Sequence, residues 1–194
     1  MNRTNILVSG ACGIVLFFSA TSSVLALDTK FAYRLGYDTG GDTFIAASFS
    51  GGGTDKIKAN QGFFFGGGAS IVNDAKDIET EITLSYKVDE IVASNGDFSW
   101  TRWPVEALLF YRWPTVRLGG GLTYHLNPHF EGSALGISVD SSFKNALGFV
   151  LQADWRLAER VNLGLRYTTL DYELEGSGVK FNSDGFGIVL SGSF

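Results

Sequence analysis

The chain has 194 residues, with 20 acidic and 15 basic side chains and a formal net charge of −5. This acidic balance argues against nucleic-acid binding, which requires a basic face, and the single cysteine excludes an internal disulfide. The length fits one domain. Although 45% of the residues are hydrophobic, no apolar stretch of about 18 residues follows the N-terminal segment, which excludes a helical membrane protein.

Residues 1–26 have the features of a secretory signal peptide. Arg3 gives a positive start, and an apolar stretch covers residues 6–18. Val24 and Ala26 then occupy positions −3 and −1 of a small-residue cleavage site. We therefore expect an exported protein whose signal is removed.

Two other interpretations of this segment are weaker. The apolar stretch is shorter than the roughly 20 residues that a membrane-crossing helix needs. Lipoprotein processing at Cys12 is disfavoured because the apolar run continues past it. Cleavage leaves one domain, residues 27–194, with a net charge of −6 and no cysteine for thiol or metal chemistry.

The remainder of the chain alternates between apolar and other residues with period two, as in the last nine residues, 186–194. Such alternation predicts β-strands. We expect eight strands in an up-and-down meander. They cover residues 31–49 (bent near Gly40-Gly41), 56–72, 78–89, 98–111, 116–124, 145–156, 161–174 and 183–194.

The connection lengths suggest an orientation. The turns after the second, fourth and sixth strands are short, whereas the loops after the third, fifth and seventh are longer or richer in Gly and Ser, the longest being residues 125–144. The first hairpin departs from this pattern. Outer-membrane barrels have short periplasmic turns and longer outer loops, so both termini are expected in the periplasm. The first hairpin, with a tight tip at residues 51–53, is interpreted as a ribbon above the membrane. Gly40-Gly41 is either a bulge or a strand break.

One face of each expected strand is apolar and the other is charged or glycine-rich. A soluble, lipocalin-like barrel would turn the apolar face inward. The polar face here carries large charged side chains rather than short surface residues, which favours lipid contact for the apolar face. Aromatic residues cluster near both ends of the strands, as membrane-interface belts do. These belts are expected to include Tyr33, Trp100, Trp103, Tyr111, Trp113, Tyr124, Trp155 and Phe194.

These features define the predicted fold class: an all-β, eight-stranded antiparallel transmembrane β-barrel. The chain resembles small outer-membrane barrels of the OmpA/OmpX type in its signal, its alternation, its aromatic belts and its terminal Phe194. The stretches 36–42 (GYDTGGD) and 102–128 (from RWPVEALL to HLNP) also resemble an uncharacterised group of exported bacterial barrels. The resemblance implies an integral protein of the cell outer membrane and carries no activity with it.

The interior of such a barrel is just wide enough for side chains to fill, and charges there must be paired. Asp154 and Arg166 flank a short turn, in register or one pair off, and are expected to form a cross-strand pair. Glu79 and Glu81 are expected to meet arginines. Asp38, Arg102 and Gln152 are further inward candidates. The expected lumen charge network consists of Arg34, Glu79, Glu81, Glu106, Arg112, Arg117, Asp154 and Arg166. It predicts a salt-bridged plug, with a narrow polar path for small solutes as the alternative.

His125 and His129 lie in the expected outer loop, near Glu131 and Ser133. This is a possible base–nucleophile set, but its spacing does not match that of lipid A deacylases. A metal site is not expected either, because no third ligand adjoins the two histidines. We expect no catalysis, no metal and no cofactor.

The expected function is structural or in surface interaction, with outer-membrane lipids and lipopolysaccharide as partners. We also expect recognition of the C-terminal strand by the barrel-assembly machinery, no nucleic acid, and a monomer. Lys56 and Lys58 near the first hairpin tip are candidate contacts for lipopolysaccharide phosphates. The alternatives are a channel for small or hydrophobic solutes and a lipid A-modifying enzyme.

Overall fold

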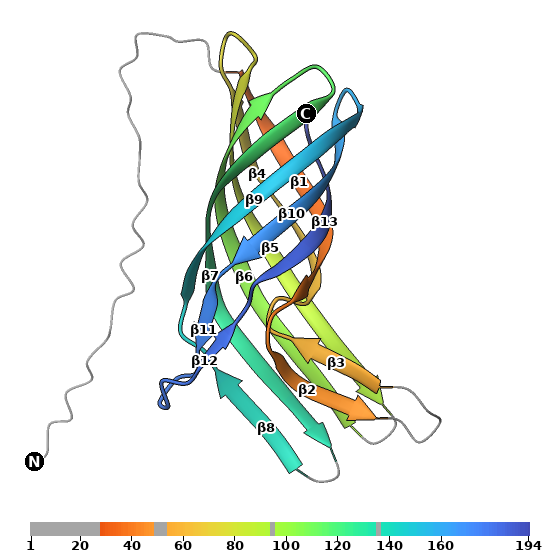
Figure 1. Cartoon of the computed structure of the whole chain (residues 1–194), viewed down its shortest axis with the longest axis vertical. Helices are drawn as coiled ribbons and strands as arrows, with labels where there is room; N and C mark the ends of the chain where they lie inside the picture. The colour runs from red at the N-terminus through yellow and green to blue at the C-terminus, as the bar shows by residue number, and fades with distance from the viewer. Residues whose placement is uncertain (1–27, 49–53, 94–95, 135–136) are drawn as a thin grey trace, which may run out of the picture.

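The computed structural model describes residues 28–48, 54–93, 96–134 and 137–194. The predicted signal peptide, the hairpin tip at residues 51–53 and the loop at Ser94-Asn95 lie outside the described residues. Regular structure in the described part of the chain consists of β-strands (Figure 1). Within those same residues, no helix is long and apolar enough to span a bilayer.

Eight antiparallel strands close into a barrel, which confirms the predicted fold class. Each strand pairs with its neighbour along the chain, and the pairing of the first with the last completes the ring. These strands are β1 (Asp28–Gly40), β4 (Gly62–Val72), β5 (Ile78–Ala93), β6 (Gly96–Arg112), β7 (Val116–Ala134), β9 (Ala146–Ala158), β10 (Val161–Thr169) and β13 (Gly185–Ser193).

The period-two sequence pattern sets the two faces of the barrel wall. In β9, the residues from 146 to 154 alternate strictly between buried and exposed. The exposed set is apolar, with Leu147, Phe149 and Leu151 each more than 60% exposed. The buried set includes Gln152 and Asp154. Since strand side chains alternate faces, this strand places polar groups inside and apolar groups outside.

The two ends of the barrel differ. At one end, here called the turn end, residues 73–77, 113–115 and 159–160 join the strands, and the C-terminus lies there (top of Figure 1). At the other, here called the loop end, β5, β6 and β7 continue beyond the ring, and β2 (Thr43–Ser48), β3 (Thr54–Lys58) and β8 (Ile137–Ser142) lie beside them.

Gly40-Gly41 is a strand break. Both glycines have positive φ, 129° and 79°, a backbone region that side chains with a Cβ rarely adopt. β1 ends there, and β2 pairs with β3 as a separate two-stranded sheet. The first hairpin therefore leaves the barrel wall, and the second predicted strand is split between β3 and β4.

The predicted long loop at residues 125–144 is wrong. β7 continues to Ala134, and β8 returns antiparallel to it. Between Thr101 and Trp103 the β6–β7 register shifts, leaving an extra residue in β7 near Asn127, whose φ is 47°. This bulge reverses the alternation, so the period-two pattern ends although the strand does not.

The seventh predicted strand, residues 161–174, is also interrupted at the loop end, whereas the eighth, residues 183–194, corresponds to β13. β10 ends at Thr169, and a short hairpin follows, made of β11 (Asp171–Glu173) and β12 (Lys180–Asn182). The predicted loop at residues 175–182 therefore contains β12.

Candidate functional site

The turn-end half of the barrel interior is organised around Arg117 of β7. Its Nη1 lies 2.5 Å from Glu81 Oε1 and 3.0 Å from Glu79 Oε2, and its Nε lies 2.6 Å from Asp154 Oδ2. Arg112 Nε approaches Glu79 Oε2 at 3.3 Å. One guanidinium thus compensates three carboxylates and connects β5, β7 and β9 through the interior.

A second group of ion pairs crosses the middle of the lumen. Glu106 of β6 accepts hydrogen bonds from Arg34 of β1 on one oxygen and from Arg166 of β10 on the other. Arg34 Nη2 also lies 3.3 Å from Glu81 Oε2. Because β1 and β10 pair with neither β6 nor each other, these contacts span the interior rather than run along one strand pair.

A third group lies nearer the loop end. Lys87 Nζ is 2.5 Å from Asp38 Oδ2 and donates a hydrogen bond of 3.0 Å to Asn60 Oδ1. Arg166 Nε is 3.7 Å from Asp38 Oδ1, which is too long for a hydrogen bond. The Asp38 carboxylate is therefore paired through one of its oxygens.

Opposite charges are balanced inside the barrel. An isolated buried charge is costly, and pairing offsets that cost. Among the described residues, the buried charged side chains are five carboxylates and five cations: Asp38, Glu79, Glu81, Glu106 and Asp154 with Arg34, Lys87, Arg102, Arg117 and Arg166. Arg112, at the turn end, keeps 22% of its side chain exposed. The predicted inward residues are brought together here except Arg102, which is buried and donates to the backbone carbonyl oxygens of Trp100 and Gln61.

The predicted Asp154–Arg166 pair is wrong. The register is one of the two that were expected, because Arg166 stands opposite Gln152 on β9 while Asp154 stands opposite Gly164, one pair away. The expected ion pair is nevertheless not formed. Asp154 faces Arg117 across the β7–β9 pair instead, and Arg166 reaches Glu106 across the lumen. In an interior this narrow, a long arginine side chain can reach opposing strands as easily as its own neighbours.

Two inward aromatic rings fill the space between the ion pairs. The Phe64 ring lies where a Cβ on Gly36 would stand, and the guanidinium carbon of Arg166 lies 5.0 Å from its centre. Phe110 likewise occupies the space beside a glycine of β7, with the guanidinium carbon of Arg117 at 4.1 Å. Each ring thus contacts a cation over its face.

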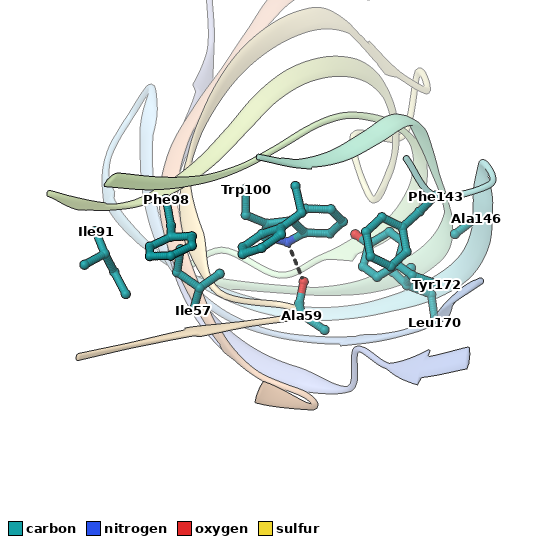
Figure 2. Packing of buried hydrophobic residues seen from close by; sticks show 10 residues of the cluster. Ile57, Ala59, Ile91, Phe98, Trp100, Phe143, Ala146, Leu170 and Tyr172 are labelled. Atoms are coloured by element: carbon teal, nitrogen blue, oxygen red, sulfur yellow. Dashed lines mark hydrogen bonds between the residues drawn. The ribbon is translucent and has the colours of Figure 1, made fainter. Parts of the chain in front are cut away.

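At the loop end the interior becomes apolar. A cluster of side chains from the barrel strands and the outer hairpins packs there; we call it the cap (Figure 2). Its buried members are Ile57, Ala59, Ile91, Phe98, Trp100, Phe130, Phe143, Ala146, Leu170 and Tyr172. Phe44, Ile45, Ala134, Leu174 and Phe181 pack against it.

Trp100 belongs to the cap, so its predicted place in a membrane-interface belt is wrong. It is 0% exposed, and its indole N–H donates to the carbonyl oxygen of Ala59 at 3.0 Å (Figure 2). In β6 the even-numbered residues point inward, including Arg102, whereas Trp103 is 44% exposed. The odd spacing between the two tryptophans puts them on opposite faces.

His125 also lies inside, not in a solvated loop. It is 2% exposed, and its Nδ1 is hydrogen-bonded to the hydroxyl of Tyr172 in the short strand β11. Burial raises the pKa of Tyr172 to about 12, so this hydroxyl keeps its proton at neutral pH. His125 is therefore shielded from any lipid substrate.

His129, four residues on, remains at the surface. Its Nδ1 is 3.3 Å from Ser142 Oγ, and its Nε2 is 3.6 Å from both Glu131 and Asp140. Both carboxylates are more than half exposed. Ser133 hydrogen-bonds toward β6 instead. The two histidines thus do not form one site.

The other predicted belt residues lie on the outer face or at its ends. Tyr33 is half-buried, and its hydroxyl donates to a backbone carbonyl in the β9–β10 turn. Six more are at least 40% exposed: Trp103, Tyr111, Trp113, Tyr124, Trp155 and Phe194. Two further aromatic pairs on this face, Tyr37–Phe63 and Tyr167–Phe186, were not predicted. Their contact at a membrane boundary stays a prediction.

Three interior features escaped the sequence interpretation. Lys87 was not included in the expected lumen charge network, although it pairs with Asp38. Asn60 offered no signal, because it lies in a turn where the alternation is interrupted. The cap was missed because its members come from separate segments, such as Phe44 and Phe181, that only the folded chain brings together.

No family model matches the chain, and no curated protein matches it in sequence. Solved structures do match in fold. Neisserial surface protein A has a TM-score of 0.51 at 14% identity, over 86% of this chain and 97% of that one. Ail of Yersinia pestis, in complex with the heparin analogue sucrose octasulfate, has a TM-score of 0.53 at 14% identity, over 85% and 96%. A second Ail structure gives 0.51 at 16% identity, over 85% and 96%.

The closed eight-strand ring and these likenesses define the class of fold: that of the small eight-stranded outer-membrane β-barrels. At these identities the likeness concerns the fold alone.

Proposed function

We propose that this protein is an integral outer-membrane β-barrel with a structural or surface-interaction role, its lumen plugged by its own charged side chains. The observation that carries the proposal is the inverted distribution of side chains across the barrel wall. Ten charged residues are buried inside, while leucines and phenylalanines of the outer face are exposed. Water would penalise so large an apolar surface, whereas a lipid bilayer accommodates it.

On this proposal the barrel lies in the outer membrane with its turn end toward the periplasm. The short turns at that end support this orientation. The signal-like segment 1–26 and the aromatic residues of the outer face support the location in the outer membrane. The C-terminal strand, ending at Phe194, would be recognised during assembly, and the surrounding lipids and lipopolysaccharide would be the permanent partners of a monomer.

The balanced interior supports a plug rather than a channel. Side chains from all eight strands meet in the lumen, and neither sign of charge is in excess to select an ion. Planar-bilayer recordings of the full mature chain test this directly. We expect no reproducible conductance after insertion has been verified by tryptophan fluorescence. A stable open level would contradict the plug and favour the alternative of a channel for small solutes.

The surface-interaction role belongs to the loop end. The described residues there, 41–48, 54–61, 89–93, 96–97, 129–134, 137–145 and 171–184, carry eleven carboxylates and four lysines, a net charge of −7. Ail has been crystallised with a polyanion, but such a charge repels polyanions and favours a basic partner. The same negative charge weakens any attraction of Lys56 and Lys58 to lipopolysaccharide phosphates.

A titration with two defined probes separates these partners. Polylysine is expected to bind the vesicle-inserted protein in a salt-dependent manner, and heparin is not. Asp140→Asn with Glu131→Gln should weaken polylysine binding, because both carboxylates are exposed on the β7–β8 hairpin. Asp28→Asn, at the turn end, is the matched control. Binding of heparin rather than polylysine would overturn the assignment.

We propose no catalytic role, and the competing hypothesis is a lipid-modifying hydrolase. His125 is out of reach, so His129 with Ser142 is the arrangement that favours this hypothesis, since a base beside a hydroxyl can activate a nucleophile. Mass analysis of lipid A with and without the gene product tests it. A lipid change that Ser142→Ala abolishes and Ser141→Ala preserves would contradict our proposal.

A further inference from the structure

We infer that the centre of the lumen holds a bound water molecule between the Asp38–Lys87 pair and the Glu106–Arg166 pair. A cavity of about 10 Å³ lies there, with Ser85, Thr168 and Phe64 among the residues that line it. On a comparable measure, one water needs roughly 10–15 Å³ together with polar partners. The cavity therefore matches one water in size. The inference rests on the closed lumen proposed above.

Four of the residues that line this cavity carry an unpartnered polar atom. Asp38 Oδ1, Ser85 Oγ, Arg166 Nε and Thr168 Oγ1 are all buried and make no hydrogen bond within the protein. Their residues are at most 4% exposed. A buried polar group without a partner costs about 1–3 kcal/mol, so four of them around one cavity indicate a shared ligand.

The chemistry of these atoms selects water over an ion. Arg166 Nε can only donate a hydrogen bond, Asp38 Oδ1 can only accept one, and the two hydroxyls can do either. A metal ion would leave the donor unsatisfied, and an anion would leave the carboxylate oxygen unsatisfied. The adjacent charges already balance, with Asp38 and Glu106 against Lys87 and Arg166.

The distances support a bridging position. Arg166 Nε and Asp38 Oδ1 are 3.7 Å apart, beyond direct hydrogen-bond range yet within reach of a common third partner. The bound water would connect the ion pairs at the loop-end side of the lumen with those at its middle. The two groups would then form one continuous hydrogen-bonded network.

A crystal structure of the full mature chain, at a resolution that reveals ordered water, tests the inference. We expect a water oxygen about 2.7–3.2 Å from at least two of the four atoms. A cavity without density, or direct pairing of Asp38 Oδ1 with Arg166 Nε, would overturn it. An open lumen with bulk water throughout would instead overturn the plug, so the two failures are distinguishable.

Unfolding equilibria of variants give a second measurement. Ser85→Ala and Thr168→Val should each raise the unfolding constant about fivefold, the loss of one modest hydrogen bond. If both hydroxyls bind the same water, the double variant should change the constant by less than the product of the two. Ser85→Ala with Thr123→Val, whose hydroxyl does not line the cavity, is the control and should be multiplicative. Multiplicative behaviour of the first pair would contradict a shared water.

Discussion

The barrel interior and the cap are built on the same strands but obey opposite rules. From the turn end to the middle of the barrel, where the outer face is apolar, the interior holds ion pairs. At the loop end, the interior is filled by aromatic and aliphatic side chains. The change occurs within β6, where Arg102 and Trp100 are consecutive inward residues. The contrast indicates which solvent each region faces. A barrel wall in contact with lipid has its apolar side chains outside and its polar side chains inside. A region in contact with water buries its apolar side chains instead.

The contrast also assigns different energetic roles. The interior ion pairs are costly to break one at a time, because the partner left behind is buried and unpaired. The cap is stabilised by apolar burial and packing, so its stability falls when a buried side chain is truncated and leaves a cavity. Substitutions in the two regions should therefore differ in kind as well as in size.

The largest effect is expected for Arg117→Ala. It leaves Glu79, Glu81 and Asp154 without their shared cation and should cost about 3–5 kcal/mol of unfolding free energy. Urea-induced unfolding from lipid vesicles measures this. Arg112→Ala is the matched control, and because Arg112 is partly exposed its loss should be below about 1 kcal/mol. Equal losses would mean that the interior is hydrated like a surface.

Trp100→Ala comes next, with an expected cost of about 3–4 kcal/mol from the cavity that it leaves in the cap. Hydrogen exchange should increase in β2, β11 and β12, whose residues pack there, while the turn-end strands stay protected. Trp103→Ala, on the outer face, should leave exchange in the cap unchanged. Uniform loss of protection throughout the barrel would argue against the cap as a separate packing unit.

Double-mutant cycles sharpen the picture of the interior. Arg117 and Asp154 are in contact, so Arg117→Ala with Asp154→Ala should show a coupling of about 1–3 kcal/mol. Arg166→Ala with Asp154→Ala should couple by less than about 0.5 kcal/mol, since each residue has its own partner. A larger coupling for the second pair would mean that Arg166 and Asp154 do interact, as the sequence had suggested.

The sequence predicted the features that depend on neighbouring residues in the chain and missed most of those that depend on contacts between distant residues. Alternation is local, so the barrel strands and the inward position of residues such as Glu106 and Arg166 could be predicted. Side-chain partners could not, because they are chosen across the lumen. The Trp100 error was avoidable, since counting from Arg102 places it inward. The extension of β7 was not predictable by alternation, because the bulge at Asn127 reverses it.

The smallest effect is expected at the exposed Lys144–Glu173 pair of the loop end, where Nζ and Oε1 are 2.6 Å apart. The pairing lowers the pKa of Glu173 and raises that of Lys144. Any stabilisation is therefore fully present between the ordinary pKa values of the two groups. It is lost as the pH falls through the lowered pKa of Glu173 or rises through the raised pKa of Lys144. Lys144→Ala should leave the melting temperature at neutral pH unchanged within error. A clear decrease in the melting temperature would mean that this ion pair stabilises the cap.

Quenching of tryptophan fluorescence by brominated lipids tests the central claim most directly, because the chain has four tryptophans that the fold divides between two environments. In single-tryptophan variants inserted into brominated bilayers, Trp103, Trp113 and Trp155 should be quenched and Trp100 should not. Strong quenching of Trp100 together with unquenched outer tryptophans would contradict the inverted barrel wall and the membrane location that follows from it.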